Sequence, residues 1–245
     1  MIEITDLNYK EILNNINVKI ESGIIGLIGA NGAGKSTLVK CISGINKNYS
    51  GEIFIKGKNL KNLSFRELAT ILCYIPQKTF INYDISVRDF LFFSRYSYNE
   101  NIKNCNNIIN NALEKINMQN YVNKNLKILS GGEFQKIMLA SAIVQGSSIW
   151  LLDEPASALD PGSSVEFYKT LKEICSNNNI TIVLISHDLN HILNNCDNII
   201  AMSKGTIIKK SEVATFLDKN ILKEVYNIDF LIEKRQDKFI CIPSI

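Results

Sequence analysis

Apolar residues along the chain gather in short runs that alternate with stretches of helical periodicity. Residues 24–28, 149–152 and 180–185 are almost entirely apolar, which is typical of strands covered on both faces of a sheet. Residues 36–43 follow the first run and a glycine-rich turn, and they have the periodicity of a helix. This alternation predicts an α/β fold with a mostly parallel sheet flanked by helices.

Two further patterns lie outside this core. The first 20 residues and residues 51–56 alternate between apolar and polar positions, which predicts antiparallel strands beside the main sheet. Between about residues 79 and 145, strand-like runs give way to helical patterns, such as residues 87–93 and 108–116, among polar loops. We therefore expect an antiparallel β sub-domain and an inserted helical sub-domain.

The segment from about residue 205 to 245 is expected to form a C-terminal extension. Its pattern predicts a short strand, a helix near residues 212–226 and a hairpin around residues 235–237. The length of 245 residues suits one large domain that carries an inserted sub-domain. We expect residues 1–245 to form a single domain of this kind.

Composition excludes several classes of protein. The 27 basic and 24 acidic residues give a formal net charge of +3, too small to indicate a nucleic-acid partner. No uncharged window of 18 apolar residues predicts a membrane span, and Glu3 and Asp6 lie where a signal peptide needs apolar residues. Six scattered cysteines without a C-x-x-C pair disfavour zinc and redox sites. We expect a soluble, intracellular protein.

The glycine-rich turn after the first buried run has the pattern G-x-x-x-x-G-K-[ST]. Glycines allow consecutive backbone N–H groups to curl around phosphate oxygens, and the N-terminus of the next helix favours the same anion. An ordinary glycine-rich turn is the alternative, but the position between strand and helix favours nucleotide binding. The predicted contacts here are Gly29, Asn31, Gly32, Ala33, Gly34, Lys35, Ser36 and Thr37.

Three side chains supply the chemistry expected of such a site. Lys35 brings a positive charge to the β- and γ-phosphates, and the Ser36 hydroxyl is a ligand for Mg²⁺. The apolar run 149–152 ends in two carboxylates, Asp153 and Glu154. Asp153 is a candidate Mg²⁺ ligand and Glu154 a candidate base for the attacking water. Taken alone, this acidic pair is more typical of a solvated strand end, and its combination with the glycine-rich loop favours the catalytic interpretation.

A third motif, Leu-Ser-Gly-Gly-Glu at residues 129–133, precedes a helical pattern through residues 135–144. By itself it is a helix N-cap with flexible turn residues. After the glycine-rich loop and before the acidic pair, it resembles the signature loop of ATP-binding cassette (ABC) ATPases. The resemblance covers essentially residues 1–210. It implies a P-loop NTPase core, ATP as the nucleotide and Mg²⁺ as the metal.

The resemblance also implies roles for four further residues. Gln77 corresponds to the Q-loop glutamine that reaches the metal and senses a transmembrane partner, and Asp160 ends the D-loop. His187 corresponds to the switch histidine that contacts the γ-phosphate, and Tyr9 to the aromatic residue that stacks on adenine. The alternatives are a polar loop residue for Gln77, a structural histidine for His187 and a core or surface tyrosine for Tyr9. His191 is interpreted as unrelated to the site.

A mechanism follows from the same resemblance. Two copies pair head to tail, so that each ATP lies between the phosphate loop of one copy and Ser130, Gly131 and Gly132 of the other. Lys35, Glu154 and His187 are the implied catalytic groups. The implied Mg²⁺ ligands are Ser36, Gln77 and Asp153. ATP closes the dimer and hydrolysis reopens it.

The chain departs from the family pattern at three positions. Glu133 ends the signature where many members have glutamine, and Phe134 and Ser141 replace expected basic residues. These changes are expected to affect how the signature helix packs or pairs, since the serine and glycines that contact phosphate are kept.

The spacing between the glycine-rich loop and the signature excludes some branches of the family. Ser130 follows Ser36 by 94 positions, which excludes the DNA-repair and chromosome members with their long coiled coils. One cassette without membrane helices also differs from translation factors and fused exporters. A peripheral subunit at the cytoplasmic face of the membrane, serving a separate polytopic permease, remains. An extracytoplasmic substrate-binding protein is its implied indirect partner.

Finer similarities favour importers of iron chelates (siderophore or haem) or cobalamin. They lie in residues 63–77, 86–96, 186–190 and 220–228. Import of zinc or manganese, and a non-transport ATP-dependent clamp, remain as alternatives. Phe80, Phe90, Phe92 and Phe93 are expected near a groove that receives a short permease helix. The transported molecule itself is not specified, because the permease and the binding protein select it.

Overall fold

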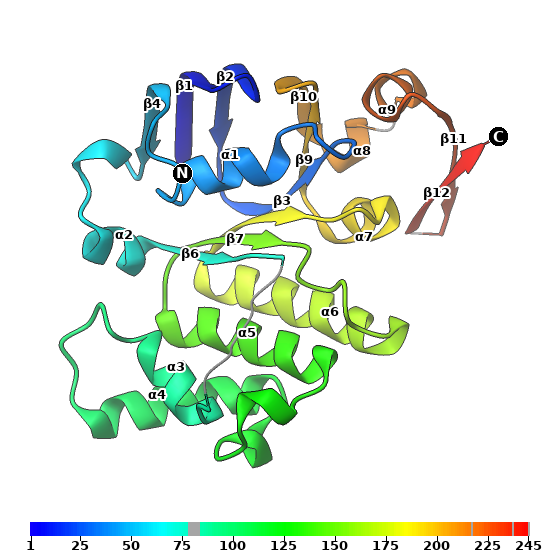
Figure 1. Cartoon of the computed structure of the whole chain (residues 1–245). Coiled ribbons are helices and arrows are strands. Elements are labelled where there is room, and N and C mark those ends of the chain that lie inside the picture. The colour runs from blue at the N-terminus through cyan, green and yellow to red at the C-terminus, as the bar shows by residue number, and fades with distance from the viewer. Residues whose placement is uncertain (78–83, 217, 237, 245) are drawn as a thin grey trace. The chain divides into compact units, whose positions relative to one another are not determined.

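The computed structural model describes residues 1–77, 84–216, 218–236 and 238–244, with the backbone alone for residue 219. The chain divides into two compact units. Unit 1 comprises Met1–Leu63 and Thr181–Ile245, and unit 2 comprises Ser64–Ile180. Each unit is described by itself, with element labels as in Figure 1.

Unit 1 contains an antiparallel sheet with the strand order β2-β1-β4-β5. Its strands are β1 (Ile2–Tyr9), β2 (Leu13–Ile20), β4 (Ser50–Ile55) and β5 (Lys58–Asn59). Ile2 pairs with both Ile20 and Ile55, and all three side chains are buried. This sheet confirms the antiparallel strands predicted from alternation, because apolar residues at every second position line its buried face.

Other strands of unit 1 carry two of the three predicted buried runs, residues 24–28 and 180–185. These strands are β3 (Gly23–Ile28), β8 (Thr181–Ile185), β9 (Asn198–Ser203) and β10 (Thr206–Glu212). Strand β3 lies between β8 and β9 and runs parallel to both, whereas β10 is antiparallel to β9. The residues of β8 are all buried, which confirms strands covered on both faces. Helix α1 (Lys35–Ile42) follows β3, as predicted.

The C-terminal part of unit 1 forms helices α8 (Val213–Phe216), α9 (Lys219–Tyr226) and strands β11 (Asp229–Arg235) and β12 (Lys238–Ser244). The predicted hairpin is confirmed, since β11 and β12 pair antiparallel. The expectation of one helix near residues 212–226 is wrong in its detail. Glu212 ends β10, and α9 begins anew because the Asp218 side chain accepts a hydrogen bond from the Asn220 N–H at 2.9 Å.

Unit 2 contains a parallel pair of strands, β6 (Leu72–Ile75) and β7 (Ile149–Asp153). Helix α2 (Phe65–Ile71) leads directly into β6, and α6 (Pro161–Asn178) follows β7. Trp150 on β7 is fully buried, and its indole N–H donates to the Ser147 carbonyl at 3.0 Å. Strand β7 confirms the predicted buried run, whereas β6 goes beyond the predicted elements.

The described part of unit 2 between residues 84 and 145 contains helices and no named strand. These are α3 (Val87–Phe93), α4 (Ile102–Lys115), α5 (Gly131–Gln145) and two 3₁₀ turns, Gln119–Tyr121 and Leu126–Ile128. Helices α3, α4 and α5 pack against one another (Figure 1). Their apolar side chains at helical spacing form the core of this layer.

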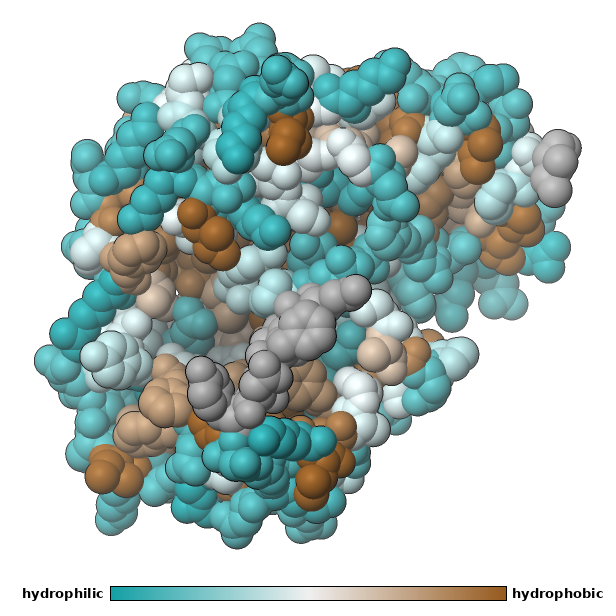
Figure 2. Space-filling view, in the orientation of Figure 1, coloured by the Kyte–Doolittle hydropathy of each residue, from teal (hydrophilic) through white to brown (hydrophobic). Residues whose placement is uncertain are grey.

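Within the residues that the structure describes, no helix has the length and apolar composition needed to cross a bilayer. The face in Figure 2 is mostly hydrophilic, and hydrophobic residues are exposed on it in small groups.

Candidate functional site

The glycine-rich loop joins β3 to α1 in unit 1, as the motif requires. Gly34 precedes the helix with φ +99°, a left-handed conformation that glycine adopts without steric cost. The Ala33 N–H donates to the Ala30 carbonyl at 3.1 Å, and the Gly205 N–H donates to the Ala33 carbonyl at 3.1 Å. These bonds hold the loop in a tight curl from which α1 starts with no side-chain cap, so its first N–H groups suit an anion.

Lys35 lies inside this curl. Its side chain is buried, and its Nζ donates to the carbonyls of Gly29 at 2.6 Å and Ala30 at 3.0 Å. A buried ammonium needs such partners because it has lost water. Ser36 and Thr37 are half-buried in the first turn of α1, and Asn31 and Gly32 are exposed at the tip of the loop.

His187 belongs to the same edge of the same sheet. Strands β3 and β8 are parallel and paired in register up to Leu27 and Ile185. The chain segments that follow them therefore leave the sheet at the same edge, where open α/β sheets bind ligands. The first contains the glycine-rich loop and the second contains Ser186 and the exposed His187.

Tyr9 lies at the end of β1, half-buried, with the Lys10 ammonium 5.3 Å from the centre of its ring. The turn that follows it packs against the glycine-rich loop. A Cβ at Gly34 would lie 2.8 Å from Leu13 Cδ2 and 3.3 Å from the Ile12 carbonyl. The hairpin of Tyr9 therefore borders the loop, which is compatible with the predicted adenine contact.

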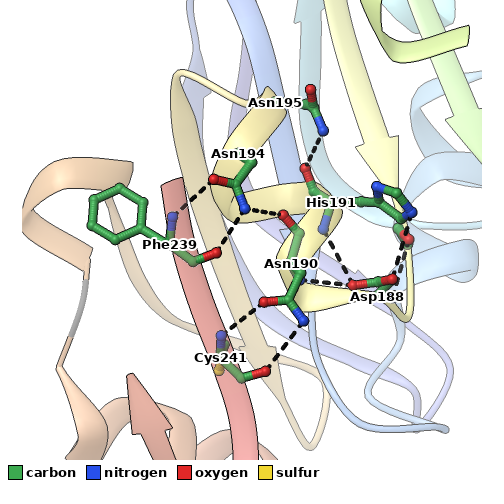
Figure 3. A network of polar contacts seen from close by, with 8 residues as sticks. Asp188, Asn190, His191, Asn194, Asn195, Phe239 and Cys241 are labelled. Atoms are coloured by element: carbon green, nitrogen blue, oxygen red, sulfur yellow. Dashed lines mark hydrogen bonds and ion pairs between the residues drawn. The ribbon is translucent and has the colours of Figure 1, made fainter. Parts of the chain in front are cut away.

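The segment after His187 is tied to the C-terminal hairpin (Figure 3). Asp188 caps α7 (Leu189–Asn195) by accepting from the N–H groups of Asn190 at 2.8 Å and His191 at 3.2 Å. Its other oxygen lies 3.5 Å from His191 Nε2. From the same helix, Asn190 and Asn194 bind the backbone of β12. His191 thus has a local partner in its own helix cap.

Asp153 and Glu154 lie at the end of β7 in unit 2, and both are buried. Glu154 has φ +54°, a left-handed conformation that costs a residue with a Cβ roughly 1–2 kcal/mol. Strain of this kind is retained mainly at functional sites. This left-handed residue directly follows Asp153, the last residue of β7.

Gln77 lies two positions beyond β6, the parallel neighbour of β7. Ile75 and Leu152 are paired at the ends of the two strands, so Gln77 and the acidic pair follow the same edge. A cavity of about 420 Å³ is lined by Gln77, Glu154 and Gly131 together with apolar side chains such as Phe134 and Phe167. Three predicted site residues of unit 2 therefore share one cavity.

The signature loop is a helix cap with unusual partners. Ser130 is the N-cap of α5, and its hydroxyl and Glu133 form a capping box. The Ser130 N–H and the Ser130 hydroxyl each donate to Glu133 Oε2 at 2.8 Å. The Tyr121 hydroxyl donates to the other oxygen, Oε1, at 2.5 Å. These hydrogen bonds, that of Tyr121 first, lower the pKa of Glu133 to about 2.

The signature also contacts the D-loop. Gln135 Nε2 donates to Ser157 Oγ at 3.2 Å, and the Ala158 N–H donates to Gln135 Oε1 at 3.3 Å. A Cβ at Gly131 would lie 3.2 Å from Ala158 Cβ, so a small residue is favoured there. Asp160 itself caps α6 by accepting from the Ser163 N–H at 3.0 Å, and hydrogen bonds from Ser163 lower its pKa.

The other two departures from the family pattern have ordinary environments. Phe134 lines the cavity next to Gln77. Ser141 is buried on α5, and its hydroxyl donates to the Met138 carbonyl at 2.6 Å. Tyr121 and Gln135 are residues that the motifs did not single out. Gln135 stood two positions beyond the motif, whereas Tyr121 has no local signal because only the tertiary fold brings it to Glu133.

The geometry can be compared with known proteins. A family model described as "ABC transporter" matches residues 13–157, more than half of the chain. The matched segment includes the glycine-rich loop, Gln77, the signature and the acidic pair. The chain belongs to the ABC transporter family. This confirms the resemblance inferred from the motifs, and with it an ATPase cassette.

Two relatives of this ABC protein are import subunits. It is 32% identical to the iron(3+)-hydroxamate import ATP-binding protein FhuC of Bacillus subtilis, over 94% of this chain and 88% of the relative. It is 30% identical to the hemin import ATP-binding protein HmuV of Bordetella avium, over 91% of this chain and 89% of the relative. Both alignments span nearly the whole cassette.

A solved ABC transporter in an inward-facing conformation has the same fold. It superposes with a TM-score of 0.85 at 22% identity, and the match covers 100% of this chain and 97% of that one. At this identity the likeness shows the fold alone. It confirms the expected fold class, a P-loop core of parallel strands with antiparallel strands and helices.

Proposed function

We propose that this chain is the ATP-hydrolysing subunit of an ABC importer for iron chelates (siderophore or haem) or cobalamin. The support is the agreement between its motifs and its full-length similarity to subunits named for import of iron(3+)-hydroxamate and hemin. In this role it lies at the cytoplasmic face of the membrane and serves a separate permease. A substrate-binding protein on the other side delivers the cargo.

ATP is held between two copies arranged head to tail. One copy contributes the glycine-rich loop, with Lys35 on the β- and γ-phosphates and Tyr9 against adenine. The other contributes Ser130, Gly131 and Gly132 at the N-terminus of α5, where the positive end of the helix dipole meets the γ-phosphate. Asp160 lies beside the same interface.

Hydrolysis needs a base and a group that stabilises developing charge. Glu154 orients the attacking water and accepts its proton, and His187 donates to the γ-phosphate. The donors assigned to Mg²⁺ fit that ion, since Ser36, Gln77 and Asp153 offer a hydroxyl, an amide and a carboxylate oxygen. When bound there, Mg²⁺ neutralises phosphate charge. Hydrolysis then removes the contacts that keep the two copies together.

Unit 2 carries a surface suited to docking of the permease. Phe65, Phe93 and Tyr96 are 67%, 63% and 84% exposed and line a hollow of about 870 Å³ with Phe92. Phe90 is half-buried on α3, and Phe80 lies outside the described residues. A short amphipathic permease helix is the proposed occupant, because aromatic side chains exposed together favour burial of an apolar helix face.

The catalytic assignment is tested with Glu154→Gln. We expect ATP binding to persist, turnover to fall at least about 10²-fold and an ATP-dependent dimer to accumulate. Glu173→Gln on α6 is the matched control, with wild-type turnover expected. Wild-type hydrolysis in Glu154→Gln would remove Glu154 as the base.

The cargo is tested by cellular uptake of labelled ferric hydroxamate, haem and cobalamin in a strain that carries Glu154→Gln. Selective loss of one uptake supports the proposal and identifies the cargo. Unchanged uptake of all three contradicts it and favours zinc or manganese. Failure to recover the chain with any membrane permease favours the clamp instead.

The docking surface is tested by Phe93→Ser, which should reduce recovery of the chain with membranes. Val165→Ser on α6 is the control, because Val165 is similarly exposed, at 66%, but lies outside the hollow. Equal membrane recovery of both variants would exclude the hollow as the docking surface.

A further inference from the structure

Glu133 collects three hydrogen bonds at the start of α5. Its Oε2 accepts from the Ser130 N–H and from the Ser130 hydroxyl, both at 2.8 Å. Its Oε1 accepts from the Tyr121 hydroxyl at 2.5 Å. An ionised carboxylate has no proton to give, so the Ser130 hydroxyl must be the donor in this contact.

The surroundings of Glu133 stabilise its negative charge. Tyr121 comes from the 3₁₀ turn Gln119–Tyr121, a separate segment of unit 2, and Lys124 Nζ lies 3.8 Å from the centre of its ring. The positive charge of Lys124 also favours the charged form of Glu133. Hydrogen bonds from Tyr121 and Ser130 favour the charged form, so Glu133 stays ionised at neutral pH.

Ser130 has a single O–H, and this has a consequence for ATP. In the proposed dimer that hydroxyl donates to the γ-phosphate bound by the other copy. While it donates to Glu133 it cannot donate to phosphate, and the carboxylate beside it repels the same anion. Engagement of ATP therefore requires the Ser130 O–H to turn away from Glu133.

We propose that Glu133 is a positioning residue that competes with ATP for the Ser130 hydroxyl and weakens ATP-dependent pairing of two copies. This inference rests on the proposed function. Glu133 acts as a brake on this pairing, because the Ser130 hydroxyl is released only when a γ-phosphate outcompetes the carboxylate. Tyr121 moderates the brake by sharing the charge of Glu133.

Two substitutions have opposite expected signs. Glu133→Gln keeps an oxygen that can accept the Ser130 N–H but removes the charge, so the hydroxyl is released more easily. ATP-dependent pairing should become roughly five- to tenfold tighter, since charge-assisted hydrogen bonds are about twice as strong as neutral ones. Tyr121→Phe removes a donor to Glu133, so the carboxylate holds Ser130 more firmly. Pairing should weaken roughly threefold.

The chain supplies a matched control. Ser64 and Glu67 form a second capping box at the start of α2, with the Ser64 N–H and hydroxyl donating to Glu67 Oε2 at 2.9 and 2.7 Å. This box lies outside the signature. Glu67→Gln should change helix capping in the same way and leave ATP-dependent pairing unaltered.

All variants are compared in a Glu154→Gln background, which prevents turnover, by sedimentation of the dimer across an ATP titration. Tighter pairing in Glu133→Gln, weaker pairing in Tyr121→Phe and no change in Glu67→Gln support the brake. A merely structural role predicts weaker pairing in both of the first two variants and so overturns it. Unchanged pairing in Glu133→Gln overturns it as well.

The same sedimentation experiment distinguishes failure of the proposed function from failure of this inference. If Glu154→Gln alone shows no ATP-dependent pairing, the head-to-tail dimer is wrong and the brake falls with it. If Glu154→Gln pairs with ATP and the two signature variants do not respond as expected, the inference alone is overturned.

Discussion

Asn194 on α7 binds the backbone of Phe239 on β12 much as a neighbouring strand would. Its Oδ1 accepts from the Phe239 N–H at 2.9 Å, and its Nδ2 donates to the Phe239 carbonyl at 2.8 Å (Figure 3). One turn earlier, Asn190 makes the same pair of bonds with Cys241, at 2.7 and 3.2 Å. Four helical residues rise about 6.0 Å and two strand residues about 6.6 Å, so the spacings match.

This match predicts a contribution to stability. Asn194→Ala should lower the free energy of unfolding by about 1–2 kcal/mol, because two backbone groups of β12 lose their partner. The Phe239 amide should exchange with solvent faster. Asn195→Ala is the control, since its side chain donates to the His191 carbonyl of its own helix. Equal protection of Phe239 in both variants would contradict the strand-like role of Asn194.

The Glu133 cap predicts a dependence of stability on pH. The pKa of Glu133 falls from an ordinary 4.5 to about 2 in the folded chain. A lowered folded pKa stabilises the native state above the unfolded value, and this contribution is lost as pH falls toward the folded one. The stability difference between wild type and Glu133→Gln should therefore be full above pH about 4.5 and shrink below it. Denaturant titrations across that range measure it, and a constant difference would contradict the ionised cap.

Substitution of Gly34 should lower stability for two reasons, its backbone conformation and the atoms that surround it. Gly34→Ala combines a left-handed residue at φ +99° with a Cβ 2.8 Å from Leu13 Cδ2. We expect a loss of about 2 kcal/mol in stability and loss of ATP binding. Gly57→Ala is the control, since Gly57 has φ +76° with no atom within 4 Å of the added Cβ. Its cost should be limited to about 1 kcal/mol of backbone strain. Thermal unfolding and nucleotide titration separate the two effects, and equal losses would rule out the steric term.

Arg95 predicts a larger loss of stability. Its buried guanidinium donates to the Val144 carbonyl at 3.0 Å near the end of α5, pairs with Glu100 and lies 3.6 Å from the centre of the Tyr98 ring. Arg95→Ala should lower the free energy of unfolding by about 2–4 kcal/mol, since it leaves Glu100 and the helix end without their cation.

Arg95→Lys should recover only part of that stability, because an ammonium cannot bind in several directions and stack at once. Arg66→Ala is the control, since its exposed side chain contacts Ser97 and Asn99. Arg66→Ala should lower the free energy of unfolding by about 0.5 kcal/mol. Chemical denaturation measures all three variants, and similar values for Arg95→Ala and Arg66→Ala would contradict the role of burial.

Local pattern was sufficient for most of the elements. The buried runs of β3, β7 and β8 can be predicted from the sequence because a strand covered on both faces is almost entirely apolar. Strand β6 could not be predicted in this way, since its four residues directly after α2 are too few to show a period. The pattern of residues 212–226 predicts a single helix. The structure instead starts α9 at Lys219, because the Asp218 side chain caps it through a hydrogen bond that the apolar pattern does not reveal.

The sequence by itself determined which groups are available for chemistry. The sequence contains the glycine-rich loop, Gln77, the signature and the acidic pair in a fixed order. This order was sufficient to infer the family. Tertiary structure decided which of these groups meet. The pairing of β3 with β8 brings His187 to the edge of the glycine-rich loop, and the fold of unit 2 brings Tyr121 to Glu133. These contacts join segments that are distant in sequence. A periodic pattern reports only the local helix or strand, so it does not predict them.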